Sequence, residues 1–148
     1  MTLKERLNQE MKQAMKARDS LRLTTIRMIL TAVKNREIEQ KKELDDREVT
    51  AVLSTMLKQR REAADAYRKG ERDELAEKEE REIEILQDFL PAQLSSEEIG
   101  KVIDSAIEET GASSMKEMGA VMKIVSGRTA GRADGKVVSE MVRKRLAG

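Results

Sequence analysis

The positions of proline and glycine constrain the fold of this chain more than any other feature of its sequence. The chain has one proline, Pro91, and of its eight glycines only Gly70 precedes residue 100. Because these two residues most often interrupt helices, the first ninety residues can form long helices and the rest shorter ones. Pro91 also disfavours a helical conformation at Leu90, so a helix is expected to end there. The sequence therefore predicts an all-α protein with two domains, residues 1–91 and residues 92–148.

Apolar residues at helical spacing predict four helices before Pro91 and three after it. The stripes span residues 3–15, 23–33, 49–67 and 75–90, followed by 99–107, 118–125 and 137–146. Asp19 or Ser20 can cap the second helix, and Gly70 can end the third. We expect an N-terminal four-helix unit followed by a small three-helix C-terminal domain.

Side chains that can cap a helix precede all three helices of the second part. Ser95 and Glu98 stand three residues apart, as do Ser114 and Glu117, and this is the spacing of a capping box. Asp134 precedes the last apolar stripe and is expected to cap that helix.

The side chains that the chain lacks exclude several kinds of chemistry. The chain contains no cysteine and no histidine, which removes thiol nucleophiles, Cys/His zinc sites and histidine acid–base catalysis. Adjacent carboxylates occur at Asp45–Asp46 and Glu79–Glu80, but consecutive residues of a helix do not face each other. We therefore expect no catalytic residue, no metal site and no cofactor.

The N-terminal segment "MTLKERLNQEMKQAMK" is charged and amphipathic and contains no apolar core of a signal peptide. No apolar run in the chain approaches the length of about 18 residues that a transmembrane helix needs. These features predict a cytoplasmic protein that does not bind membranes.

Charge is distributed unevenly over the second part of the chain, although the whole protein has a formal net charge of only +1. Residues 91–111 carry five acidic side chains and one basic one, whereas residues 112–148 carry eight basic and three acidic ones. Such an asymmetry is typical of a segment that binds polyanions. The candidates for contact with RNA phosphates are Lys123, Arg128, Arg132 and Lys136.

Base recognition by stacking is not expected in this segment, because the two aromatic residues, Tyr67 and Phe89, lie outside it. Recognition of the sugar–phosphate backbone or of RNA shape is favoured instead, without specificity for DNA.

The stretch "SGRTAGRADGKVVSEMV" allows two interpretations. Gly127, Gly131 and Gly135 recur every four residues, and a basic residue follows each of them. A phosphate could bind among these basic side chains and the amides near Gly135, at the start of a helix. The same residues also suit a turn that enters a helix, with Gly131 and Gly135 easing the backbone and Asp134 as the cap. Asp134 would compete with a phosphate at that helix start.

Four segments of the chain together resemble the YqeY family. The segments are "IRMILTAVKNREIE", "FLPAQLSSEEI", "ETGASSMKEMGAVM" and "GRADGKVVSEMVRKRL". They occur in the same order and spacing as in that family, and the resemblance covers nearly the whole chain. YqeY proteins are similar to the helical C-terminal tail of GatB, a component of the tRNA-dependent amidotransferase that makes Gln-tRNA or Asn-tRNA. Gly131, Arg132, Ala133 and Asp134 match the Gly-basic-Ala-Asn stretch of that tail. This chain departs from the tail at Asp134–Gly135, where GatB commonly has Asn-Pro.

The resemblance implies a tRNA-binding accessory module without its own active site, because the amidotransferase tail contacts the outer corner of the tRNA. A first alternative is a protein-interaction module whose N-terminal helices dock on an amidotransferase or a tRNA synthetase. A second alternative is a carbon–nitrogen ligase that uses glutamine as amide donor. The sequence contains no nucleotide-binding loop and no amidase nucleophile, so we do not expect the isolated chain to be an enzyme.

Overall fold

The structure of the protein is a computed structural model that describes all 148 residues. It contains seven α-helices, one short 3-10 helix and no strand, which confirms the all-α prediction. The chain divides into two compact units, unit 1 (Met1–Leu90) and unit 2 (Pro91–Gly148). Unit 1 contains α1 (Leu3–Ala17), α2 (Ser20–Gln40), α3 (Asp46–Lys69) and α4 (Asp73–Gln87). Unit 2 contains α5 (Ser96–Thr110), the 3-10 helix η1 (Met115–Glu117), α6 (Met118–Thr129) and α7 (Gly135–Ala147).

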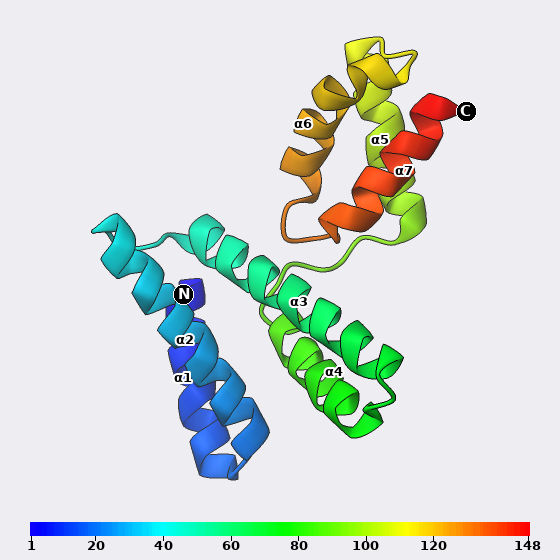
Figure 1. Cartoon of the computed structure of the whole chain (residues 1–148). Helices are drawn as coiled ribbons and strands as arrows, with labels where there is room; N and C mark the ends of the chain where they lie inside the picture. The colour runs from blue at the N-terminus through cyan, green and yellow to red at the C-terminus, as the bar shows by residue number, and fades with distance from the viewer. The chain divides into compact units, whose positions relative to one another are not determined.

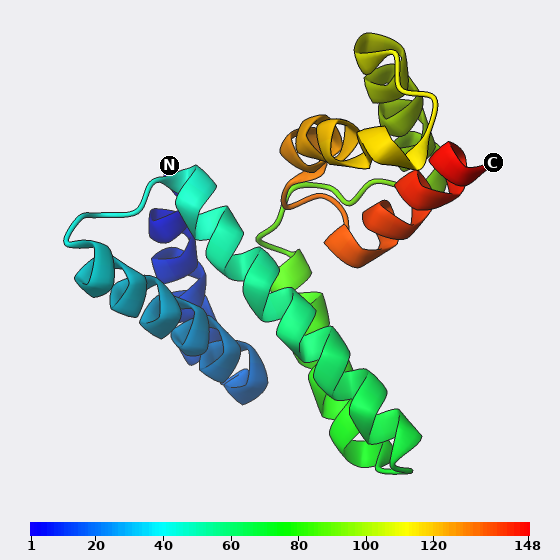
Figure 2. The ribbon, with the colours of Figure 1, turned by 45° about the horizontal axis from the view of Figure 1, so that its top comes forward.

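Unit 1 is built from two helical hairpins. Helices α1 and α2 lie side by side, as do α3 and α4, and α2 packs against both α3 and α4 (Figures 1 and 2). The core between the hairpins is aliphatic, with Phe89 as its single aromatic residue. Its fully buried members include Leu7, Ile26, Ile29, Val49, Leu53 and Leu86.

Phe89 and Leu90 follow α4 and are buried in the core of unit 1. Arg6 and Arg22 lie over the ring of Phe89, with their guanidinium carbons 4.9 and 5.6 Å from its centre. Arg22 also pairs with Glu10 at 3.0 Å and with Asp88 at 2.8 Å. These contacts fasten the end of α4 to both helices of the first hairpin.

Unit 2 has its own core, formed by α5, α6 and α7. Its buried members are again small or aliphatic: Ile99, Ile103, Ala106, Ala112, Val121, Val125, Val138, Val142 and Leu146. On α7 the three residues Val138, Val142 and Leu146 recur every four positions, which places them on one face of the helix. Leu94, in the segment before α5, packs against this core.

Side-chain caps start most of the helices. The Ser95 hydroxyl accepts a hydrogen bond from the Glu98 amide, and the Glu98 carboxylate accepts one from the Ser95 amide, both at 3.1 Å. Asp19 caps α2, and Gly111 ends α5 in the left-handed conformation, with φ of 67°. Ser114 forms no such cap; instead Glu117 accepts a hydrogen bond from the amide of Ser113, and a 3-10 turn precedes α6.

Glu37 connects α1, α2 and the loop before α3. Its carboxylate accepts hydrogen bonds from Lys4 Nζ at 2.7 Å and from the Leu44 amide at 2.9 Å. These two donors stabilise the charged form and hold the pKa of Glu37 below the ordinary value of a glutamate.

We predict that Glu37→Gln makes the stability of the protein less dependent on acid pH. Because the pKa of Glu37 is lower in the folded state, the wild-type carboxylate contributes stability above the ordinary glutamate pKa and loses it as the pH falls through the folded value. Thermal unfolding between pH 3 and pH 7 should therefore show a smaller loss of Tm in the variant. Glu39→Gln, an exposed change on the same helix, is the control and should unfold like the wild type.

Candidate nucleic-acid interface

The turn between α6 and α7 is the centre of the predicted phosphate site. Gly131 has a φ of 74°, and the Arg132 amide donates a hydrogen bond of 2.8 Å to the Thr129 carbonyl. Asp134 is the N-cap of α7, and its Oδ1 accepts a hydrogen bond of 2.9 Å from the Lys136 amide. A carboxylate therefore already occupies the amide donor at the start of α7 that a phosphate would use.

The turn also holds the segment that leads into α5. The Leu94 amide donates to the Arg132 carbonyl at 2.8 Å, and Gln93 Nε2 donates to the Gly131 carbonyl at 3.0 Å. Arg132 Nε returns a hydrogen bond of 3.3 Å to the Ala92 carbonyl. The turn is thus a fastening point inside unit 2. This role of Gln93 could not be predicted, because no spacing along the chain relates residues 92–94 to residues 131–132.

The three glycines of the periodic stretch lie in different environments. Gly127 is inside α6, Gly131 is in the turn, and Gly135 is the first residue of α7. A Cβ atom at Gly127 or Gly135 would meet no heavy atom within 4 Å. Of the three, only Gly131 has a backbone conformation that favours glycine.

The four candidate cations differ in the partners that the structure gives them. Arg128, in the last turn of α6, places Nη2 2.8 Å from both carboxylate oxygens of Glu109 on α5. Arg132 is half-buried and held by the Ala92 carbonyl through Nε. Lys123, in the middle of α6, and Lys136, at the start of α7, are exposed, and their ammonium groups form no ion pair. Of the predicted set, only Arg128 is paired with a carboxylate, and the two lysines are the fully exposed cations that form no ion pair.

A second ion pair of the same kind joins α5 to α7. Arg145 pairs with Asp104, and Arg145 Nη2 lies 3.0 Å from the position that a Cβ atom would take at the buried Gly100. The charge difference between residues 91–111 and 112–148 is evident from the sequence, but these pairings are not. The acidic side chains of α5 thus neutralise part of the positive charge of α6 and α7.

The carboxylate neighbours considered for catalysis are used structurally. Asp45 caps α3, and Asp46 accepts a hydrogen bond of 2.9 Å from the Leu3 amide. Glu80 pairs with Arg68 at 3.0 Å, whereas Glu79 lies 3.7 Å from Arg60 on the same α3–α4 interface.

Glu82 is a buried carboxylate that the sequence did not single out. It is 6% exposed and pairs with Arg60 at 3.0 Å, and burial raises its pKa. No three carboxylates of the chain converge in a way that could hold a metal ion.

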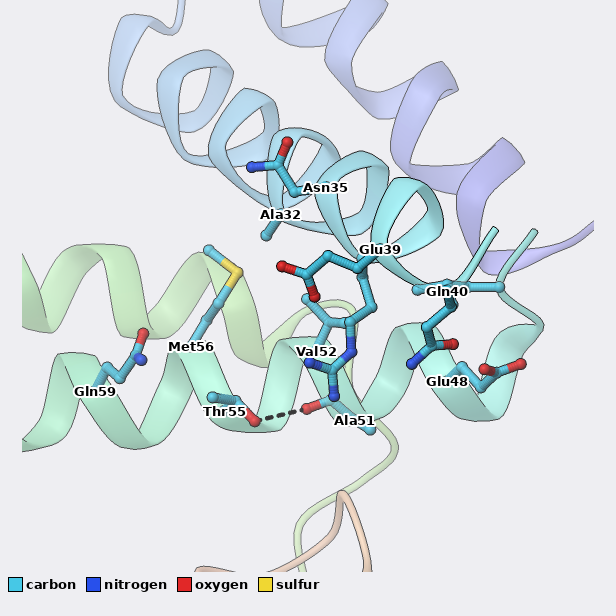
Figure 3. A pocket seen from close by; sticks show the side chains of 12 residues that line it. Ala32, Asn35, Glu39, Gln40, Glu48, Ala51, Val52, Thr55, Met56 and Gln59 are labelled. Carbon is cyan, nitrogen blue, oxygen red and sulfur yellow. Dashed lines mark hydrogen bonds between the residues drawn. The ribbon is translucent and has the colours of Figure 1, made fainter. Parts of the chain in front are cut away.

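A groove of about 340 Å³ runs between α2 and α3 in unit 1. Figure 3 shows Met56 pointing from α3 towards α2, with Ala32 and Asn35 on the facing helix. Val52 and Ala51 continue its apolar surface, and its edges are polar, with Glu39, Gln40, Glu48 and Gln59. The surface of the groove is therefore a mixture of apolar and polar side chains.

None of the helices is both long and apolar enough to span a membrane.

In comparisons with known proteins, a family model matches almost the whole chain and several relatives match a large part of it. The family model described as "Yqey-like protein" matches residues 4–146. The chain is 37% identical over 106 residues to "Altered inheritance of mitochondria protein 41, mitochondrial" of Eremothecium gossypii, covering 70% of this chain and 58% of that protein. The protein of the same name in Kluyveromyces lactis is 41% identical over 87 residues, which cover 58% of this chain and 47% of the relative. The one in Vanderwaltozyma polyspora is 33% identical over 120 residues, or 76% and 64% of the two chains. In each case the match spans roughly half to two thirds of the relative's length.

These names contradict the prediction of a cytoplasmic protein, since the relatives are named as mitochondrial proteins. The prediction rested partly on the amphipathic pattern of the N-terminal segment. In the structure this segment is α1, whose pattern arises because Leu7 and Ala14 are buried in unit 1. The pattern reports how the helix packs and carries no information about the compartment.

We predict opposite effects on stability when two glycines of the periodic stretch are each replaced by alanine. Gly131→Ala should destabilise the protein by about 1–2 kcal/mol, because the left-handed conformation brings Cβ too close to the following carbonyl. Gly127→Ala should stabilise it by about 0.5–1 kcal/mol, because Gly127 lies in a helix with open space around it. Urea unfolding of the two variants measures both values. A loss of stability in both would show that Gly127 has a packing role.

Proposed function

Because the chain belongs to the YqeY family, we propose that it is an accessory module that binds tRNA through unit 2 and has no active site of its own. The observation that supports this proposal most strongly is the excess of basic side chains in residues 112–148, of which Lys123 and Lys136 are exposed and unpaired. The similarity of YqeY proteins to the tail of GatB directs the proposal to tRNA.

The contacts would be made by side chains with the phosphate backbone. Asp134 caps α7, so the amides at that helix start do not form an empty phosphate cradle. Phe89 is buried in unit 1 and Tyr67 lies on α3, so no aromatic side chain of unit 2 offers a platform for a base. Binding of this kind is governed by phosphate charge and by the shape of the folded RNA.

A second candidate function is the docking of a protein partner on unit 1, such as another component of an amidotransferase or a tRNA synthetase. The groove between α2 and α3 favours it, because Met56, Val52 and Ala51 form an apolar surface with polar edges. Hydrogen exchange in the presence of tRNA, or of a candidate partner, separates the two functions. Protection within residues 112–148 would support RNA binding by unit 2, and protection within residues 1–90 would support docking on unit 1.

We predict that Lys123→Gln and Lys136→Gln each weaken tRNA binding and reduce its dependence on salt. For each phosphate that a variant no longer binds, the slope of log K against log salt concentration should fall in magnitude by about 0.7–0.9. Fluorescence anisotropy with labelled tRNA at several salt concentrations measures both quantities, and an unstructured RNA of equal length tests the preference for folded RNA.

Lys58→Gln is the matched control, because Lys58 is an exposed lysine on α3 in unit 1. It should bind tRNA like the wild type. Absence of wild-type binding at low salt, or an equal loss in all three variants, would contradict the proposal that unit 2 binds RNA.

A further inference from the structure

Of the four candidate phosphate ligands, Arg128 makes the most hydrogen bonds to other side chains of the protein. Its Nη2 lies 2.8 Å from each oxygen of the Glu109 carboxylate, and its Nη1 lies 3.4 Å from the Ser105 hydroxyl. Ser105 and Glu109 stand four residues apart, so they present their side chains on the same face of α5. The guanidinium is thereby held on α5.

A carboxylate and a phosphate use the same donors of a guanidinium group. Arg128 Nη2 cannot make its present contact with both oxygens of Glu109 and also bind a phosphate in the same way. The side chains of Arg128 and Glu109 remain 43% and 48% exposed. An ion pair this exposed contributes little to stability, so a competing anion can break it without unfolding the helices.

We infer that Glu109 is an internal competitor for phosphate, and that RNA must displace it before Arg128 joins the RNA-binding surface. This inference rests on the proposed function, since it concerns RNA binding by unit 2. Before RNA binds, Lys123 and Lys136 are the exposed members of the candidate set that form no ion pair. Once Glu109 is displaced, Arg128 adds a further contact.

The competition favours a polyanion over a single phosphate. An RNA already held by Lys123 or Lys136 keeps its other phosphates close to unit 2, so Arg128 meets them at a high effective concentration. Inorganic phosphate has no such second attachment and must compete with a carboxylate that is permanently tethered 2.8 Å away. The pair therefore discriminates against small anions.

The test is the substitution Glu109→Gln, with Glu108→Gln as its matched control. Both changes remove one negative charge from the C-terminal half of α5, but Glu108 is exposed and forms no ion pair with Arg128. We expect Glu109→Gln to bind unfractionated tRNA about 2–5-fold more tightly than Glu108→Gln at 0.15 M salt, where long-range effects of charge are largely screened. The salt slopes of the two variants should be similar, because Arg128 contacts a phosphate in both complexes and only the cost of displacing Glu109 differs.

The double variant Arg128→Gln/Glu109→Gln tests whether Arg128 causes the tighter binding of Glu109→Gln. If Arg128 makes the additional contact, the double variant should not keep the advantage and should bind like Arg128→Gln alone. Thermal unfolding of each variant checks that the substitutions leave the protein folded.

The outcomes separate the inference from the proposed function. If the wild type binds tRNA but Glu109→Gln shows no advantage over Glu108→Gln, the inference is overturned and the proposed function stands. Retention of the advantage in the double variant overturns the inference in the same way. If neither the wild type nor Glu109→Gln binds tRNA at low salt, the proposed function fails and the inference fails with it.

Discussion

The contact of Arg22 with Phe89 is the interaction on which the arrangement of unit 1 depends. The chain has one phenylalanine, and its ring lies under the guanidinium groups of Arg6 and Arg22. Arg22 also binds Glu10 on α1 and Asp88 after α4, so a single side chain of α2 connects three segments of the unit. Because the remaining core residues are aliphatic or small, none of them can combine packing with a directional polar contact in this way. These contacts hold the end of α4 against α1 and α2, just before the chain leaves unit 1 at Leu90.

The two units differ in how they use charge. Residues 1–90 contain as many basic as acidic side chains, and many of these are paired within the unit, as in Lys4–Glu37 and Arg68–Glu80. In unit 2 the acids are concentrated on α5 and the bases on the segment from η1 to α7. Arg128 and Arg145 are neutralised by α5, whereas Lys123 and Lys136 are not. Unit 2 therefore has two kinds of cation. Lys123 and Lys136 can contact an anion directly, whereas Arg128 and Arg145 must first break an ion pair.

The helices and most of their boundaries could be predicted from the sequence because they depend on local interactions. Ser95 with Glu98, Asp19 before α2 and Gly111 after α5 act through hydrogen bonds or backbone angles within a few residues. Ser114 shows the limit of such reasoning, because it has the spacing of a capping box but its hydroxyl makes no cap. The candidate interface was harder to predict, since its decisive contacts join residues far apart in sequence. Arg128 and Glu109 are separated by a helix–helix connection, and Gln93 reaches Gly131 across 38 residues.

The turn between α6 and α7 limits the kind of recognition that unit 2 can perform. A phosphate-binding loop selects its ligand with backbone amides that converge on one point. Here the Lys136 amide donates to Asp134, and the carbonyls of Gly131 and Arg132 accept from Gln93 and Leu94. The Arg132 and Lys136 amides and these two carbonyls are thus committed to the fold, so we expect side chains to make the contacts with a polyanion. Flexible side chains do not impose a geometry on one phosphate, so under the proposed function any preference among RNAs must come from the spacing of the cations of unit 2 along the RNA.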